Sequence, residues 1–176
     1  GDPFKSTSGH VRVYQYDAAN GWNQLGSDID GESSYDYSGW SVSLSSDGST
    51  VAIGAYQNDG EDKSTSGHVR IYQFIGGSWN QKGSDIDGEN AGDRSGYSVS
   101  LSSDGLTVAI GAIANDDERE TAGHVRIYKS IGGSWTHLGS VIDGEYGGDY
   151  SGYSVSLSSY RNAFTMTIGH DESLQG

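Results

Sequence analysis

The chain has 176 residues, of which 31 are Leu, Ile, Val or Phe, and its 24 acidic and 10 basic residues give a formal net charge of −14. An acidic chain of this kind repels phosphate backbones and anionic lipid, so we expect no nucleic-acid partner. It also contains no apolar run of about 18 residues, so we expect no membrane insertion. The absence of cysteine excludes disulfides, thiolate metal sites and thiol nucleophiles.

Internal repetition organises the chain. The string G-H-V-R-[VI]-Y occurs at 9–14, 67–72 and 123–128. In each copy it is followed by a Trp, then I-D-G-E, then D-x-S-G-[WY]-S-V-S-L-S-S. A repeat of about 50 residues is typical of a propeller or a solenoid. We therefore interpret 1–176 as a single repeat domain, with units at 9–66, 67–122 and 123–176, the last of which is atypical after Ser159.

Every segment of a unit is predicted to be a strand. His68–Phe74 and Ser98–Ser102 alternate apolar and polar residues with period two, and Thr107–Ala112 is a short β-branched apolar run. Gly76-Gly77 or Asp104-Gly105 separates neighbouring strands. Asp104-Gly105 is typical of a two-residue type I′ hairpin turn. The strands expected are, in chain order, His68–Phe74, Trp79–Ile86, Ser98–Ser102 and Thr107–Ala112.

Such a four-stranded antiparallel meander buries its faces only by stacking on its neighbours. The sequence therefore predicts an all-β fold of β-propeller blades, with about three blade equivalents.

The motif D-x-S-G-[WY]-S-V-S-L-S-S-D-G-x-T-V-A-I-G-A, followed by G-H-V-R-I-Y, resembles the FG-GAP repeats of integrin-α-type β-propellers. The resemblance implies seven-bladed propellers found in many secreted or surface proteins of microbes and algae. The chain departs from the family pattern at the Phe-Gly pair, which is Ser-Gly here, with the aromatic moved to Trp40, Tyr97 and Tyr153. The family's D-x-D-x-D-G calcium loop is also absent from the first hairpin of each blade.

Acidic residues recur between the Trp of each unit and the following S-G. They follow the pattern D-x-D-G-E-x-x-x-D, with Val141 in place of the first Asp of the third copy. Calcium takes six to eight oxygens, often from Gly-bearing loops, so this pattern makes calcium the one candidate cofactor. The alternative is that Asp and Gly only shape the turn between blades. The candidate calcium ligands are Asp28, Asp30, Glu32, Asp36, Asp85, Asp87, Glu89, Asp93, Asp143, Glu145 and Asp149.

Other recurring side chains are interpreted as structural. His10, His68 and His124 share one repeat position, where packing between blades accounts for them better than a metal does. Trp22, Trp79 and Trp135 share another, where an indole is expected to cover the neighbouring blade.

Aromatic residues that do not recur are better ligand candidates, because the fold does not require them. Tyr35, Tyr37, Tyr146 and Tyr150 fit this description, since the middle unit has Gly92 and Arg94 at the nearest equivalent positions.

These observations favour a non-catalytic extracellular or cell-surface module that binds proteins or acts as a scaffold for adhesion or assembly. The alternative is a carbohydrate-binding propeller lectin that uses the loop tyrosines. No G-x-S-x-G motif or other catalytic spacing is present, so an enzyme is not expected.

The repeat units also predict a partner. The chain starts with the outer strands of one blade and ends with the inner strands of another, so each end leaves an unpaired strand edge. We expect Gly9–Tyr16 of one copy to contact the Tyr153–Gly169 hairpin of a second copy or of a further segment of the same protein. Two chains joined head to tail would complete six blades. A contact of this kind that does not close would propagate as a filament.

Overall fold

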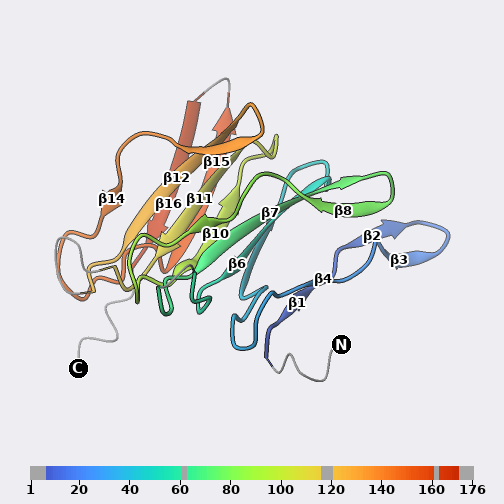
Figure 1. Cartoon of the computed structure of the whole chain (residues 1–176). Coiled ribbons are helices and arrows are strands. Elements are labelled where there is room, and N and C mark those ends of the chain that lie inside the picture. Colours follow the sequence, from blue (N-terminus) through green and yellow to red (C-terminus); the bar gives the residue numbers. More distant parts are fainter. Residues whose placement is uncertain (1–6, 61–62, 116–120, 161–162, 171–176) are drawn as a thin grey trace.

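The computed structural model describes residues 7–60, 63–115, 121–160 and 163–170. All its regular elements are β-strands, as predicted. The described part of the chain has no helix long and apolar enough to cross a membrane. Figure 1 shows the strands as successive sheets that stack side by side, with the first strands at one end of the stack and the last hairpin at the other.

The stack consists of four structural units: a half-blade, two full blades and a hairpin. The N-terminal half-blade contains β1 (His10–Val11), β2 (Tyr14–Asp17), β3 (Gly21–Gln24) and β4 (Ile29–Asp30). The first full blade contains β5 (Ser41–Leu44), β6 (Thr50–Ala55), β7 (His68–Ile75), β8 (Ser78–Gln81) and β9 (Ile86–Asp87). The second full blade contains β10 (Ser95–Leu101), β11 (Thr107–Ala112), β12 (His124–Ile131), β13 (Ser134–His137) and β14 (Ile142–Asp143). The C-terminal hairpin contains β15 (Ser154–Tyr160) and β16 (Ala163–Gly169).

Each full blade is an antiparallel meander of consecutive strands, in the order β5-β6-β7-β8 and β10-β11-β12-β13. The expected fourth strand, Trp79–Ile86, is wrong in one respect, because it is broken into β8 and β9, which both pair with β7. The break occurs where Gly83 adopts a left-handed backbone (φ +80°). Two more residues lie between Gln81 and Ile86 than between their partners, so Lys82–Asp85 bulges out of the ladder.

The hairpin turn at Asp104-Gly105 also differs from the prediction. Only Gly105 has a positive φ, whereas a type I′ turn needs one at both central residues. The turn is longer, because Ser102 donates its N–H to the Thr107 carbonyl and accepts the N–H of Gly105. The Asp104 carboxylate accepts the Ser102 hydroxyl and the Leu106 N–H, which fixes the four-residue loop.

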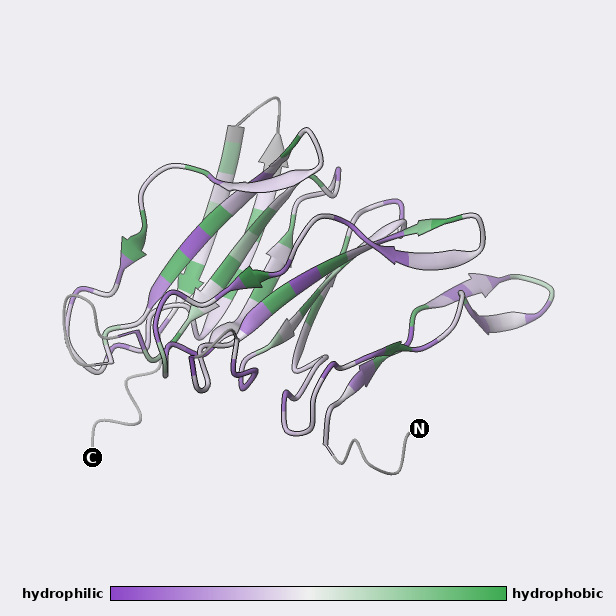
Figure 2. Ribbon diagram, in the orientation of Figure 1, coloured by the Kyte–Doolittle hydropathy of each residue, from purple (hydrophilic) through white to green (hydrophobic). Residues whose placement is uncertain are grey.

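The hydrophobic core lies between sheets rather than within one. Between the two full blades, Val69 and Ile71 of β7 pack against Val99, Leu101 and other residues of the second full blade. Figure 2 shows the alternation of apolar and polar residues along β7 and β12 that gives each strand two different faces. Each blade is therefore stable only where a neighbour covers it.

Candidate functional site

Hydrogen bonds and close backbone approaches join neighbouring blades in the same way at each complete interface. The Ser41 hydroxyl donates to the Gly96 carbonyl (2.8 Å), and the equivalent Ser98 hydroxyl donates to the Gly152 carbonyl (2.6 Å). A Cβ atom built on Gly54 would lie 2.1 Å from the Gly96 carbonyl oxygen. The backbones of neighbouring blades are thus in contact where the S-G motif of one blade faces the second strand of the other.

The recurring Trp residues also act between blades. Trp79 donates its indole N–H to the Leu25 carbonyl of the N-terminal half-blade (2.7 Å), and Trp135 donates to the Lys82 carbonyl of the first full blade (2.7 Å). These contacts agree with the structural interpretation made from the sequence. Trp22 has no such contact and is 70% exposed, because no described residues precede its half-blade in the stack.

The face of the first full blade next to the N-terminal half-blade is partly uncovered. Val42 and Leu44 are 53% and 48% exposed, whereas the equivalent Val99 and Leu101 are 8% and 5% exposed. Among the described strands, β1 pairs only with β4 and β2 only with β3, so the edge that would pair with an inner hairpin is open. An apolar groove of about 220 Å³ follows this edge, lined by Val11, Val13, Val42, Leu44 and Val51 among others.

Whereas the N-terminal half-blade supplies outer strands, the C-terminal hairpin supplies the inner strands of a blade. Its Val155, Leu157, Met166 and Ile168 pack on the second full blade, but it has no described outer strands beside β16. Thr165 and Thr167 are exposed on β16. The two ends of the described chain therefore present one blade's outer strands and another blade's inner strands.

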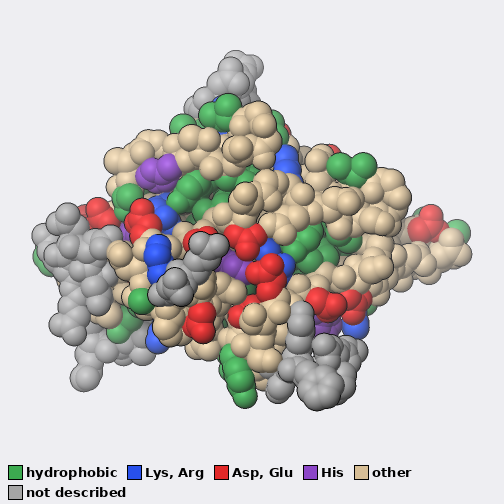
Figure 3. All heavy atoms as spheres, viewed as in Figure 1, with side chains coloured by type: hydrophobic (Ala, Val, Ile, Leu, Met, Phe, Trp, Pro, Cys, Tyr) green, Lys and Arg blue, Asp and Glu red, His purple; other side chains and the backbone are tan. Residues whose placement is uncertain are grey.

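A second candidate site is a polar recess of about 710 Å³ at the end of the N-terminal half-blade and the first full blade. It is lined by the loop from Glu32 to Asp36, by Asn58 and Asp59, and by His68, Asp85 and Asp87. Figure 3 shows acidic side chains gathered around a histidine on the viewed face.

Several of the predicted calcium ligands have their own protein partners. Asp28 forms an ion pair with Arg12 (2.8 Å) and accepts the Gln24 amide, and these contacts lower the pKa of its carboxyl to about 2. Asp36, Asp93 and Asp149 each accept the backbone N–H three residues earlier in their own loop (2.8 Å each). Glu89 faces Arg126 (3.4 Å).

Four further predicted calcium ligands belong to no group of converging metal-ligating side chains among the described residues. Asp30, Asp87 and Asp143 lie exposed on β4, β9 and β14, and Glu145 is exposed in the loop after β14. Calcium binding by one of these loops stays a prediction.

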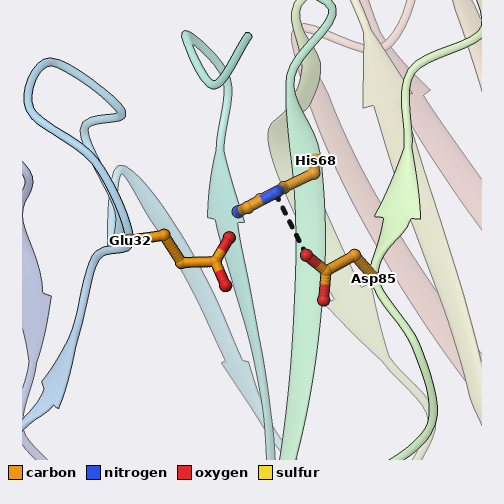
Figure 4. A group of neighbouring side chains, drawn as sticks. All are labelled: Glu32, His68 and Asp85. Atoms are coloured by element: carbon orange, nitrogen blue, oxygen red, sulfur yellow. Dashed lines mark ion pairs between the residues drawn. The ribbon is translucent and has the colours of Figure 1, made fainter. Parts of the chain in front are cut away.

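Glu32, His68 and Asp85 do come together, although they belong to two repeat units. One ligand atom from each lies within 4.8 Å of the other two, the one such group found in the described residues. The Lys82–Asp85 bulge places Asp85 beside the first residue of β7, where His68 Nδ1 lies 3.6 Å from Asp85 Oδ2. Figure 4 shows the imidazole between the two carboxylates.

Burial sets the charge of this histidine. Its side chain is only 2% exposed, and this burial lowers its pKa, with a further contribution from the positive charge of Arg70. Asp85 and Glu32 act in the opposite direction but do not reverse the shift. The imidazole is therefore neutral near pH 7, the form that ligates metals.

The four predicted ligand-binding tyrosines do not form one site. Tyr35 lines the recess and Tyr37 contacts Tyr56 (ring centroids 5.9 Å apart), whereas Tyr146 and Tyr150 lie in the loop before the C-terminal hairpin. Tyr37, Tyr150 and the equivalent Arg94 all have φ between 50° and 58°, so the fold imposes this backbone whatever the side chain.

The sequence analysis missed a row of aromatic rings that crosses the blades. Trp40, Tyr97 and Tyr153 share one repeat position, and Tyr97 lies 5.6 Å from Trp40 and 5.3 Å from Tyr153 between ring centroids. Tyr56 contacts both Trp40 and Tyr97. Burial, together with a hydrogen bond to Tyr153, raises the pKa of Tyr97 to about 12. The recurrence of an aromatic after S-G was the available signal.

The FG-GAP repeat matches residues 28–72 and 84–128, which together make up half of the chain. The chain belongs to the FG-GAP repeat family. The two matched segments each run from an acidic loop into the following G-H-V-R-I-Y strand, so they span the interfaces between blades.

The fold of this FG-GAP chain is also found among solved structures. The periplasmic gluconolactonase PpgL of Pseudomonas aeruginosa aligns with a TM-score of 0.52 over 96% of this chain, at 17% sequence identity. This likeness confirms the propeller-like, all-β fold. The chain spans 46% of that structure, less than half its length. No curated protein sequence matches the chain.

Proposed function

We propose that this chain is a non-catalytic extracellular scaffold module that assembles by completing blades between copies. The observation that carries the proposal is the contrast between Val42 and Leu44, which are half exposed, and Val99 and Leu101, which are buried at the same repeat positions. An inner hairpin from a second copy, or from a further segment of the same protein, would supply the missing cover. The extracellular location rests on the resemblance to secreted and surface FG-GAP proteins.

The repeat gives the register of the proposed contact. In the second full blade, β11 pairs with β12 so that Ala109 faces Ile127 and Val108 faces Tyr128. The equivalent pairing between copies sets Thr167 of β16 opposite Val13 and Met166 opposite Tyr14. The exposed β16 edge thereby satisfies the open edge of β1 and β2.

The same equivalence between repeat units predicts which hydrogen bonds would join the two copies. Ser154 would donate its hydroxyl to the Gly39 carbonyl of the second copy, as Ser41 does to Gly96. Ser156 would accept the N–H of Leu44, as Ser43 accepts the N–H of Leu101. Trp22 would then find a carbonyl acceptor at Leu138, as Trp135 does at Lys82.

The first experiment measures the mass of the full chain in solution by light scattering over a wide concentration range. We expect a species of two or more chains, and we expect Val42→Asp to convert it to a monomer, because the charge would be buried at the contact. Ile75→Asp is the matched control. Ile75 is similarly exposed (58%) but is the last residue of β7, away from the groove, so the mass should not change. A wild-type chain that is folded and monomeric at every concentration would overturn the proposal.

The second experiment tests the register. The chain has no cysteine, so a disulfide in the double variant Tyr14→Cys, Met166→Cys arises only from the introduced pair. Under mild oxidation we expect covalent multimers. A pair displaced by two residues, Tyr16→Cys with Met166→Cys, should remain unlinked. Equal cross-linking of both pairs would show that the copies associate in some other way.

Carbohydrate binding is a second candidate function, favoured by the aromatic row. Sugar rings stack on aromatic side chains, and Trp40 and Tyr153 are 50% and 40% exposed. We expect a glycan-array signal that Trp40→Ala abolishes and Trp22→Ala preserves, since Trp22 is exposed outside the row. The absence of any glycan signal from the wild-type chain would remove this candidate.

A further inference from the structure

One side-chain cluster combines nitrogen and oxygen donors from two blades. Glu32 follows β4 of the N-terminal half-blade, whereas His68 and Asp85 belong to the first full blade. Imidazole suits zinc and other first-row transition metals, while calcium is held by oxygen alone. The chemistry of this group therefore differs from that of an acidic calcium loop.

The histidine of the cluster has a buried polar atom with no partner. His68 Nε2 is inaccessible to solvent and makes no hydrogen bond, and the same holds for the equivalent Nε2 of His124 in the next blade, so the second carboxylate, that of Asp85, is what distinguishes the two positions. An unsatisfied buried nitrogen destabilises the folded protein, and an ion bound by that nitrogen would remove the penalty. In Figure 4 the outer end of the imidazole is directed toward the Glu32 carboxylate.

The next blade supplies a natural comparison. His124 and Glu89 occupy the positions of His68 and Glu32, and Arg126 pairs with Glu89 as Arg70 pairs with Glu32 (3.4 and 3.3 Å). The position of Asp85, however, is Val141. The repeat thus contains the same arrangement with and without its third ligand.

We propose that Glu32, His68 and Asp85 bind a divalent transition-metal cation, with Zn²⁺ as the best match to one imidazole and two carboxylates. Donor atoms around a tetrahedral Zn²⁺ with bonds of about 2.1 Å lie roughly 3.4 Å apart. The ligand atoms of the cluster lie within 4.8 Å of one another, and rotation of the Glu32 side chain, which is 46% exposed, would bring its carboxylate closer to the other two. The recess in front of the cluster leaves room for water as the remaining ligand.

The ion would act as a staple between the N-terminal half-blade and the first full blade. Arg70 already links the same two bodies through the Asp30 carbonyl (2.9 Å) and Glu32. A cation held by Glu32 on one side and by His68 and Asp85 on the other adds a second link. Because the site forms only when the blades are stacked, the ion stabilises the folded chain over the unfolded one.

The test uses the untagged, metal-free chain and measures zinc stoichiometry by calorimetry and melting temperature by circular dichroism. We expect one Zn²⁺ per chain and a rise in melting temperature that grows with zinc concentration. Asp85→Val, which copies the third unit, should lose both. Val141→Asp should create a second site with His124 and Glu89 and raise the stoichiometry to two.

Control variants distinguish zinc binding at this cluster from zinc binding elsewhere on the chain. His137→Gln removes an exposed histidine outside the cluster and should change nothing. Calcium at the same concentration should not displace Zn²⁺ from the cluster. Glu32→Gln, which removes another proposed ligand, should also abolish zinc binding, and it tests the site even if Val141→Asp does not fold. Retention of the zinc signal in both Asp85→Val and Glu32→Gln, or displacement of Zn²⁺ by an equal concentration of calcium, would overturn the proposal.

Discussion

Gly54 lies at a close backbone approach between two blades. A side chain there would meet the Gly96 carbonyl oxygen at 2.1 Å, and backbone of a neighbouring blade cannot yield as a flexible side chain does. At the equivalent Gly169, a Cβ atom would meet mainly the rotatable hydroxyl of Ser154. The same residue type therefore has different roles along the stack.

We predict that Gly54→Ala lowers the free energy of unfolding by about 3 kcal/mol, because the two blades must separate to admit the methyl group. Gly169→Ala should cost far less in the monomer. Urea denaturation of both variants measures the difference. Equal losses would show that the approach between blades is not what requires glycine.

Tyr97 offers a second test at the level of a single side chain. Its pKa of about 12 lies above the ordinary value near 10, mainly because burial disfavours the phenolate. The neutral phenol therefore stabilises the fold fully below pH 10, and this contribution is lost as the pH rises toward 12.

An ultraviolet titration of the wild type minus that of Tyr97→Phe should show one tyrosine that ionises near pH 12. Tyr146→Phe, which removes a tyrosine that is 69% exposed and lies outside both the row and the proposed contact between copies, is the control. A difference curve for Tyr97 centred near 10 would contradict the packed arrangement of the aromatic row.

At the level of elements, the strands that carry Trp79 and Trp135 are each anchored to the blade before them. We predict that Trp135→Ala lowers the free energy of unfolding by about 2 kcal/mol, since it removes a half-buried indole and its hydrogen bond to Lys82. Trp22→Ala should change the stability of the dilute monomer by less than about 0.5 kcal/mol. Thermal melts of both variants at low concentration measure the contrast, and a large loss for Trp22→Ala there would be inconsistent with its exposure.

The repeat made most of the elements predictable. Apolar and polar alternation located β7 and, through the repeat, β12, whereas a short β-branched apolar run located β11, which is buried along its whole length. The break between β8 and β9 was not predictable from alternation, since it depends on the left-handed backbone of Gly83. The turn at Gly105 was misjudged because Asp-Gly alone does not specify how many residues the loop contains.

The candidate sites were less predictable for a physical reason. The sequence grouped acidic residues by unit, and several of those carboxylates bond within their own loop or to a nearby Arg. The cluster of Glu32, His68 and Asp85 is formed across a blade interface, so it depends on how the sheets stack. Its one sequence signal is Val141, which interrupts the acidic pattern in the third unit.

At the level of the whole molecule, stability should depend on concentration. Association at the open β1–β2 edge would bury Val42, Leu44 and Trp22, and an assembled state that buries apolar surface is favoured by mass action. We predict that the melting temperature of the wild type rises with protein concentration, whereas that of Val42→Asp stays constant. Calorimetric scans at several concentrations measure this, and a constant wild-type value would speak against assembly.

The two ends of the stack differ, and this gives any assembly a direction. One end offers outer strands and the other an inner hairpin, so each added copy recreates the same two ends until a ring closes. A copy with its groove blocked at Val42 keeps a working C-terminal hairpin. It can join a growing assembly but cannot accept the next chain. Small amounts of such a variant would therefore act as a terminator, shortening open filaments and preventing rings from closing.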